Sequence, residues 1–270
     1  MMKLIIIQVV FFCWSIAAFA IGKESQIPSD RKVKNLKVMT YNIHHCNPPS
    51  EGDKIDVAAI AKVIKNEKPD LVALQEVDVN TERSGKGINQ AKELARLTGM
   101  NYFFSKAIDH QGGDYGVAVL SRFPILDSTR FILPIDPVIK GETRTIAAIT
   151  VEISKGKKII FASTHLDLKE QNRLTQAELI VKHFEKSNLP MILGGDFNAL
   201  PDSKVIQYLD KSFTRSCQEC AFTIPVEVPN RTIDFVMYKS DGTFESLLTR
   251  VIDEKYASDH LPVVTELKVK

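Results

Sequence analysis

The stretch MILGGDFN, residues 191–198, joins a short apolar run to two polar side chains. The first three residues read as a buried strand. Gly194 and Gly195 follow them, and we expect the backbone to bend sharply at these glycines, so that Asp196 and Asn198 point the same way. An ordinary turn is the alternative, because Asp and Asn are common in turns. The stretch predicts a strand that delivers a carboxylate and an amide to a crevice.

The same arrangement, a polar side chain at the end of an apolar run, recurs along the chain. A strand end lets a side chain reach a crevice while its scaffold stays rigid. Taken singly, each of these polar residues has a plain explanation, such as a surface acid or a structural histidine. Asp234 differs, because a carboxylate inside a strand needs a metal, a cation or a protonated histidine nearby. The residues at such positions are Asn42, Glu76, His165, Asp196 with Asn198, Asp234, and Asp259 with His260.

These residue types together suit the hydrolysis of a phosphate ester. The attacking water must lose a proton near neutral pH, and an Asp or His within hydrogen-bond reach can accept it. The phosphorane-like centre gains negative charge, which a hard divalent cation held by carboxylate oxygens can neutralise, and oxygen ligands favour Mg²⁺ or Mn²⁺. Amide and imidazole donors hold the phosphoryl oxygens without repelling them. The pattern therefore predicts a metal-dependent phosphoesterase site.

Strands and helices alternate at both ends of the chain, with many strands between them. This order predicts an α/β protein with helices outside packed sheets. No repeat or linker divides the chain after residue 35, so residues 36–270 read as one domain. The expected helices are 55–65, 89–97, 169–186 and 203–208. The expected strands are 36–43, 71–74, 102–106, 116–121, 125–133, 145–153, 158–164, 191–193, 232–238, 244–251 and 261–269.

The first twenty residues have a different character. Lys3 precedes the apolar run 4–19, and Ala18-Phe19-Ala20 has the small-x-small form of a cleavage site. A membrane anchor is the alternative, since about 20 apolar residues span a bilayer. The run is shorter than that and a polar segment follows it. We therefore predict a signal peptide at residues 1–20, an exposed segment at 21–35, and a secreted or periplasmic monomer without a stable membrane anchor.

The charge balance bears on the partner. Residues 1–20 hold one Lys and no acid, which leaves 34 of the 35 Lys and Arg against 33 Asp and Glu. Duplex binding depends on neutralising many phosphates, so this balance counts against non-specific binding to DNA. No stripe of interleaved basic and aromatic residues indicates single-strand binding either.

The cysteines allow several readings. Cys217-Gln-Glu-Cys220 favours a local disulfide or two free thiols over a redox pair, and the absence of a second CxxC motif from the sequence argues against zinc. Export would allow pairing, because the compartment is oxidising. The role of Cys46 stays open.

At the polar strand ends the chain resembles the endonuclease/exonuclease/phosphatase superfamily, whose members include pancreatic-type deoxyribonuclease, apurinic/apyrimidinic endonuclease, neutral sphingomyelinase and inositol polyphosphate 5-phosphatase. The likeness covers nearly all of the mature chain, in the family's order. The matching blocks are MTYNI (39–43), PDLVALQEV (69–77), YG (115–116) with LSR (120–122), STHL (163–166), GDFN (195–198), IDF (233–235) and SDHLP (258–262).

The resemblance implies a fold and a metal site. The fold would be a four-layer α/β/β/α sandwich of two packed, mainly antiparallel sheets, with the site at one edge of the sheets. Glu76 would be the main Mg²⁺ ligand, with Mn²⁺ as an alternative ion. Asn42 and Asp259 would assist directly or through water.

The resemblance also implies catalytic roles. Asp196 would orient or deprotonate the water, and Asn198 would hold the phosphate. His260, polarised by Asp234, would contact or protonate the phosphoryl group. His165 would be the second imidazole of the nuclease-like and sphingomyelinase-like branches.

Three further residues are expected to contact substrate. Arg144 resembles an arginine that some members place near the site, and Tyr115 reads equally as the family's phosphate-contacting tyrosine or as a packing aromatic. Arg83 follows Glu76 closely and would meet a second anionic group, unless its loop is merely solvated. Val117 stands where many bacterial relatives have Asn, so it is given no role.

The expected substrate is a phosphodiester or phosphomonoester in a nucleic acid, a phospholipid head group or a sugar phosphate, and the resemblance does not choose among them. A binding module that kept the fold but lost catalysis is the alternative. Such a module would be expected to lack one or more of Glu76, Asp196, Asn198 and His260, and all four are present.

Overall fold

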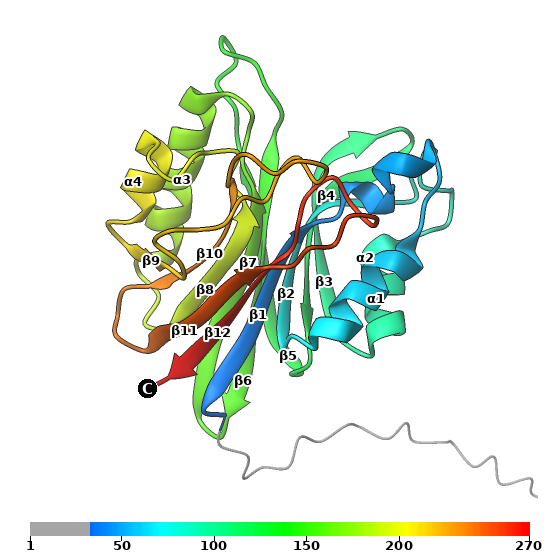
Figure 1. Ribbon diagram of the computed structural model, residues 1–270. Helices are drawn as coiled ribbons and strands as arrows, with labels where there is room; N and C mark the ends of the chain where they lie inside the picture. The colour runs from blue at the N-terminus through cyan, green and yellow to red at the C-terminus, as the bar shows by residue number, and fades with distance from the viewer. Residues whose placement is uncertain (1–32) are drawn as a thin grey trace, which may run out of the picture.

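The computed structural model describes residues 33–270, which form two stacked six-stranded sheets (Figure 1). The first sheet runs β11 (Phe244–Val251), β12 (Val263–Val269), β1 (Asn35–Asn42), β2 (Leu71–Val79), β4 (Gly113–Ser121) and β3 (Asn101–His110). The second sheet runs β5 (Ile125–Leu133), β6 (Arg144–Ser154), β7 (Lys157–His165), β8 (Met191–Asp196), β10 (Asp234–Lys239) and β9 (Phe213–Arg215). The expected signal peptide at 1–20, and the exposed segment as far as residue 32, lie outside the described residues.

Helices cover the outer face of each sheet. The helices α1 (Val57–Glu67) and α2 (Gln90–Thr98) lie on the first sheet, and α3 (Glu170–Phe184) and α4 (Lys204–Leu209) lie on the second (Figure 1). Two short 3₁₀ turns, η1 (His44–Cys46) and η2 (Pro49–Glu51), follow β1. The helix ends use ordinary capping: the Asp56 side chain accepts from Ala59 N, and Gly99 closes α2 with a left-handed φ of 69°.

Three apolar layers hold this sandwich together. One lies between the first sheet and its helices, one between the second sheet and its helices, and one between the two sheets, where Val38 and Phe161 are fully buried. Within the described residues, β1 pairs with β2 and β7 with β8 in parallel, and the other pairs are antiparallel. The predicted four-layer α/β/β/α sandwich with mainly antiparallel sheets is therefore confirmed.

The two glycines of the opening stretch have a different purpose from the one expected. Gly194 and Gly195 lie inside the straight strand β8. A Cβ on Gly194 would lie 2.8 Å from Ala73 Cβ of the facing sheet, and a Cβ on Gly195 would lie 2.6 Å from the Thr164 carbonyl oxygen. Close approach of neighbouring chain, rather than a bend, requires glycine here. The left-handed backbone comes later, at Asn198, where φ is 47°.

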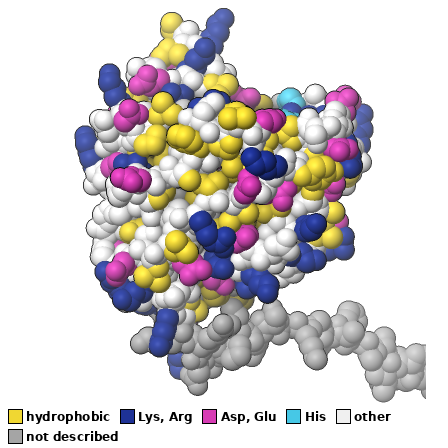
Figure 2. Space-filling model, viewed as in Figure 1, with side chains coloured by type: hydrophobic (Ala, Val, Ile, Leu, Met, Phe, Trp, Pro, Cys, Tyr) yellow, Lys and Arg dark blue, Asp and Glu magenta, His cyan; other side chains and the backbone are white. Residues whose placement is uncertain are grey.

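The surface seen in Figure 2 carries charges of both signs. Lys and Arg side chains are interspersed with Asp and Glu over this face instead of gathering in one basic patch (Figure 2). Hydrophobic side chains gather over the upper part of the face, above the loop that joins β9 to β10 (Figure 2). No helix in residues 33–270 combines the length and the apolar character needed to cross a membrane.

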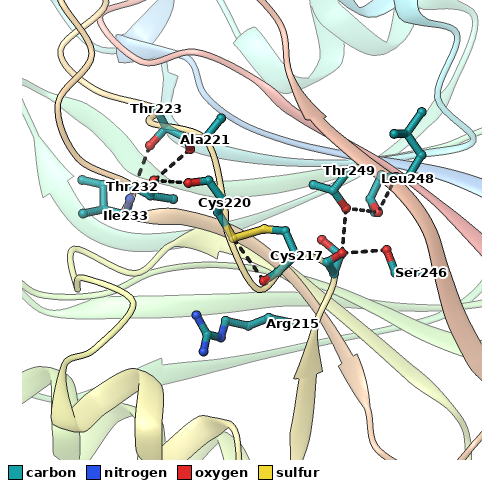
Figure 3. Close-up of a disulfide and its surroundings, with 12 residues drawn as sticks. Arg215, Cys217, Cys220, Ala221, Thr223, Thr232, Ile233, Ser246, Leu248 and Thr249 are labelled. Atoms are coloured by element: carbon teal, nitrogen blue, oxygen red, sulfur yellow. Dashed lines mark hydrogen bonds between the residues drawn. A yellow bond between two sulfur atoms is a disulfide. The ribbon is translucent and has the colours of Figure 1, made fainter.

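A disulfide closes a short turn near the start of the loop between β9 and β10 (Figure 3). Cys217 and Cys220 are bonded, with their Cα atoms 5.3 Å apart, and Cys46 is a buried free thiol. The Thr232 hydroxyl donates to the Ala221 carbonyl over 2.8 Å, and Ile233 N donates to the Thr223 hydroxyl over 3.3 Å (Figure 3). The loop is thus fastened to the residues that lead directly into Asp234.

Candidate active site

Strand direction explains why distant polar residues meet. The carboxyl ends of β1, β7 and β8 lie at one edge of the sandwich, and the antiparallel strands β6, β10 and β12 begin at that edge. Asp196, the last residue of β8, is in register with His165 on β7 and with Asp234 on β10. Residues 259 and 260 lie just before β12, beside the end of β1. The expected convergence at one sheet edge follows from this topology.

The Asn42 amide lies at the centre of the cluster and is almost fully buried. Its Nδ2 donates to Glu76 Oε1 and to Asp196 Oδ2, each over 3.1 Å, and lies 3.5 Å from His260 Nε2. Glu76 belongs to the first sheet and Asp196 to the second. A single amide nitrogen therefore joins carboxylates from both sheets.

Glu76 occupies an irregular part of its strand. The pairing of β2 with β4 shifts register between Leu74 and Val77, and Glu76 itself has a left-handed φ of 58°. A β-bulge of this kind re-aims a side chain, and a left-handed conformation costs a non-glycine residue about 1–2 kcal/mol. Burial alone would raise the pKa of Glu76, but the neighbouring His45 and the hydrogen bond from Asn42 hold it well below its usual value. The side chain is 22% exposed, so its carboxylate is ionised and accessible.

His260 and Asp234 form a buried pair. His260 Nδ1 lies 2.9 Å from Asp234 Oδ2, and both side chains are at most 5% exposed. Burial by itself lowers the pKa of His260, but the Asp234 carboxylate outweighs it and raises that pKa to about 10. The imidazole is therefore protonated at neutral pH, with Nδ1–H donating to Asp234 and Nε2–H facing Asn42 and Asp196.

Asp196 is buried among both charges and donors. Burial, and then the negative charge of Asp234, raise the pKa of Asp196 to about 7. Its Oδ1 accepts a 2.8 Å hydrogen bond from Asn198 N, and its Oδ2 lies 3.5 Å from His165 Nε2 and 3.7 Å from His260 Nε2. A carboxylate with a pKa near neutrality is suited to accept a proton from water.

The His165 tautomer follows from Arg144. The guanidinium Nη1 of Arg144 lies 3.3 Å from His165 Nδ1, and because arginine is always protonated, Nδ1 must be the acceptor. The hydrogen is then on Nε2, which faces Asp196. Burial and the neighbouring Arg144 hold the pKa of His165 well below its usual value, so this imidazole is neutral. The same Nη1 lies 2.8 Å from Glu142 Oε1.

Tyr115 and Arg83 lie together beside Glu76. The Arg83 guanidinium lies over the Tyr115 ring, 5.5 Å from its centroid, and contacts Asp78 through Nε–Oδ2 at 2.7 Å and Nη2–Oδ1 at 2.9 Å. Tyr115 is 9% exposed, and burial followed by the charge of Glu76 raises the pKa of its hydroxyl. Arg83 is therefore anchored by a bidentate ion pair in an ordered segment rather than carried on a solvated loop.

Asn198 and Asp259 lie at the border of the cluster and are both partly exposed. The Asn198 Nδ2 donates to the Leu166 carbonyl over 2.9 Å, which leaves its Oδ1 outside this bond. Asp259 Oδ1 lies 3.4 Å from the Ser258 hydroxyl, and that hydroxyl also donates to the Asn42 carbonyl over 2.7 Å. Every site residue expected from the sequence thus lies at this edge of the sandwich. Arg83 and Tyr115 lie beside Glu76, where they contact each other and Asp78.

Two residues near Glu76 were not expected from the sequence. Gln75 is fully buried and donates through Nε2 to the Ser163 hydroxyl of the second sheet over 3.0 Å. His45 Nδ1 lies 4.0 Å from Glu76 Oε2. A polar residue inside an apolar run was a signal for Gln75, and the paired histidines directly after the MTYNI block were a signal for His45.

The donor set fits a hard divalent cation. Glu76 and Asp259 supply partly exposed carboxylate oxygens, the ligand type that Mg²⁺ and Mn²⁺ prefer, whereas Asn42 turns its Nδ2 toward Glu76 and its Oδ1 accepts from His44 N. Nearby, potential ligand atoms of Asp196, Asp234 and His260 lie within 4.8 Å of one another. The buried Oδ1 of Asp234 has no hydrogen-bond partner within residues 33–270. Several carboxylates near one protonated imidazole leave negative charge that a bound cation would offset.

Comparisons with known proteins agree with this geometry. A family model described as "Endonuclease/Exonuclease/phosphatase family" matches residues 39–260. An endonuclease/exonuclease/phosphatase from Beutenbergia cavernae has a TM-score of 0.74 at 22% identity, over 88% of this chain and 72% of that one. A comparison with curated proteins finds no match.

Two other solved structures illustrate the range of the fold. A mannosyl-6-phosphatase from Bacteroides thetaiotaomicron has a TM-score of 0.70 at 20% identity, over 86% of this chain and 99% of that one. The human Nocturnin catalytic domain with a bound sulfate anion has a TM-score of 0.67 at 21% identity, over 88% of this chain and 94% of that one. At these identities the likeness shows the fold alone. The family match over 39–260 establishes that the chain belongs to the endonuclease/exonuclease/phosphatase family, whose members are hydrolytic phosphoesterases.

Proposed function

We propose that this chain is a Mg²⁺-dependent phosphoesterase, with Mn²⁺ as a substitute ion, that hydrolyses a phosphodiester or phosphomonoester outside the cytoplasm. The observation that carries the proposal is the Asn42 amide, whose Nδ2 contacts Glu76 and Asp196 and faces His260. It brings a proposed metal ligand, a proposed base and a protonated imidazole to one place. A structural cluster would have no need of a partly exposed carboxylate, a base with a pKa of about 7 and a charged imidazole side by side.

The residues divide the reaction between them. A divalent cation bound by Glu76, with Asn42 and Asp259 assisting, would neutralise charge on the phosphoryl oxygens. Asp196 accepts the proton of the attacking water, since its pKa of about 7 leaves much of it ionised near neutral pH. His260 donates its Nε2–H to the phosphoryl group, and Asp234 stabilises the imidazolium.

The remaining side chains hold the substrate. We propose that His165 presents its Nε2–H to Asp196 or to a phosphoryl oxygen, with Arg144 fixing the tautomer. With its Nδ2 engaged by the Leu166 carbonyl, Asn198 would use its Oδ1 to accept a hydrogen bond from the attacking water, and Tyr115 with Arg83 forms the adjacent rim. Arg83, whose Nε and Nη2 already donate to Asp78, would meet a second anionic group through its remaining N–H groups.

The substrate class is best tested by a direct screen. The mixed charge of the face seen in Figure 2 and the near-neutral charge of the mature chain favour a small phosphate ester or a lipid head group over non-specific duplex binding. The purified chain would be assayed with bis(p-nitrophenyl) phosphate, p-nitrophenyl phosphate, plasmid DNA, sphingomyelin, phosphatidylinositol and sugar phosphates, each with Mg²⁺, Mn²⁺ or EDTA. We expect cation-dependent turnover of at least one. Failure with every substrate and ion would favour an inactive binding module of the same fold.

Glu76→Gln should separate metal binding from folding. The substitution keeps the hydrogen bond to Asn42 in reach but removes the negative charge that would hold the cation. We expect the Mn²⁺ dissociation constant, measured by calorimetry, to rise at least tenfold, with a matching rise in the Mn²⁺ concentration for half-maximal turnover. The Glu82→Gln variant, in an exposed ion pair with Lys86, is the control and should bind as the wild type does. Equal affinities for wild type and Glu76→Gln would remove Glu76 from the metal site.

We also propose export as a monomer without a retained anchor. The apolar run before residue 20 and the Cys217–Cys220 disulfide both support export, because structural disulfides persist mainly in oxidising compartments. Expressed in a bacterium with its own leader, the protein should be recovered outside the cytoplasm. Mass spectrometry should give an N-terminus at Ile21, and size exclusion with light scattering should give a monomer mass. A retained leader would contradict the cleavage site.

A further inference from the structure

The turn that follows β1 has an unusual backbone. His44, His45 and Cys46 have φ values of 44°, 42° and 60°, so three successive non-glycine residues are left-handed. L-residues visit this region mainly as isolated positions, because the Cβ crowds the backbone. Such a conformation persists only where surrounding contacts impose it, and it is typical of functional sites.

Contacts on every side hold this turn in place. His44 N donates to Asn42 Oδ1 over 3.1 Å, and Asp56 N donates to the Cys46 carbonyl over 2.7 Å. The Gln90 amide donates to the His45 carbonyl over 2.6 Å and accepts from Asp78 N over 2.8 Å, which ties the turn to the strand that carries Glu76. The left-handed backbone is thus built into the site.

The consequence is the placement of the His45 ring. Its Nδ1 is buried, lacks a hydrogen-bond partner among residues 33–270, and lies 4.0 Å from Glu76 Oε2. The other carboxylate oxygen, Oε1, accepts from Asn42. The two oxygens of Glu76 therefore face two different side chains, and a small movement of either group would close the Nδ1–Oε2 gap to a hydrogen bond.

We infer that His45 is a positioning residue for Glu76: its Nδ1–H faces Oε2 and, with Asn42 at Oε1, holds the carboxylate in the orientation that binds the divalent cation. This inference rests on the proposed metal-dependent function. His44 does not share the role, because its Nδ1 is engaged with the Asn47 carbonyl over 2.9 Å. Groups that orient a metal ligand typically contribute 10–100-fold to metal affinity.

The test compares substitutions that tolerate the same backbone. Asn and Gly both accept a left-handed φ, and the Asn amide nitrogen can occupy nearly the place of His Nδ1. Mn²⁺ binding would be measured by electron paramagnetic resonance for wild type, His45→Asn, His45→Gly and the neighbouring control His44→Gly. Circular dichroism would establish that each variant is folded.

We expect His45→Gly to weaken Mn²⁺ binding at least tenfold, and His45→Asn and His44→Gly to stay within about threefold of wild type. Unchanged binding in His45→Gly, or equal losses in His45→Asn and His45→Gly, would overturn the positioning role. An equal loss in His44→Gly would assign the effect to the turn backbone and also overturn it. A wild-type protein that binds no Mn²⁺ would instead refute the metal-dependent function on which the inference rests.

Discussion

Asp196→Asn is expected to lower kcat by about 10²–10⁴-fold, the usual contribution of a general base. The substitution keeps the shape of the side chain and leaves an oxygen to accept the hydrogen bond from Asn198 N. It removes the group whose pKa of about 7 lets it take a proton from water. The loss should therefore appear in turnover rather than in folding.

The stability of the same variant provides a second readout. The pKa of Asp196 is raised from its ordinary value of 3.8 to about 7 in the folded protein, so folding disfavours the ionised carboxylate. The free energy of unfolding therefore falls as the pH rises from 3.8 to about 7. A neutral Asn escapes this penalty. Because Asn does not titrate, the melting temperature of Asp196→Asn in EDTA should fall less than that of wild type as the pH rises from about 4 to about 7.

The kinetic comparison needs a matched substitution. Asp202 is an exposed aspartate in the loop that follows Asn198, so Asp202→Asn should keep the wild-type rate. Steady-state kinetics on the substrate identified by the screen would be compared for both variants. Wild-type turnover in Asp196→Asn would rule out its role as base and would shift the proton acceptor to another group.

Most of the architecture could be predicted from local pattern. The strands β5 and β11 begin and end where the sequence predicted them, and Gly99 ends α2 as expected. The α2 helix carries a period-3.6 pattern whose physical cause is local, because Ala91, Leu94 and Ala95 are buried and the opposite face is solvated. The three-residue strand β9 and the 3₁₀ turns were missed, since such short pieces carry no periodicity.

The sequence predicted which residues form the site but not how they are arranged in space. Polar residues after apolar runs are visible in the sequence, and the topology then forces Asp196 and Asp234 into register. The bulge at Glu76 was invisible, because it depends on pairing with β4, which is distant in the chain. The glycine pair was misread for a similar reason: the atoms that exclude a Cβ from Gly194 belong to the facing sheet.

The largest effect on stability is expected at Asp78, a fully buried carboxylate that follows Glu76 by two residues. It accepts hydrogen bonds from the Thr81 hydroxyl at 2.8 Å, the Ser84 hydroxyl at 2.6 Å and the Arg83 guanidinium at 2.7 Å. Although burial raises its pKa, the bonds from Arg83 and the hydroxyls dominate and hold it below the usual value. Asp78 therefore holds Thr81, Arg83 and Ser84 together beside the proposed metal ligand Glu76.

Asp78→Ala should lower the free energy of unfolding by about 3–5 kcal/mol, because it leaves a partly buried guanidinium and two buried hydroxyls without their acceptor. Urea denaturation of the two proteins, followed by circular dichroism, measures the difference. The control is Asp109→Ala, which breaks an ion pair with Lys106 at an aspartate that is 91% exposed, and it should cost less than about 1 kcal/mol. If both substitutions lower the free energy of unfolding equally, Arg83 and the two hydroxyls must be hydrated as readily as Lys106 once their acceptor is gone. The segment beside Glu76 would then be held by its backbone rather than by Asp78.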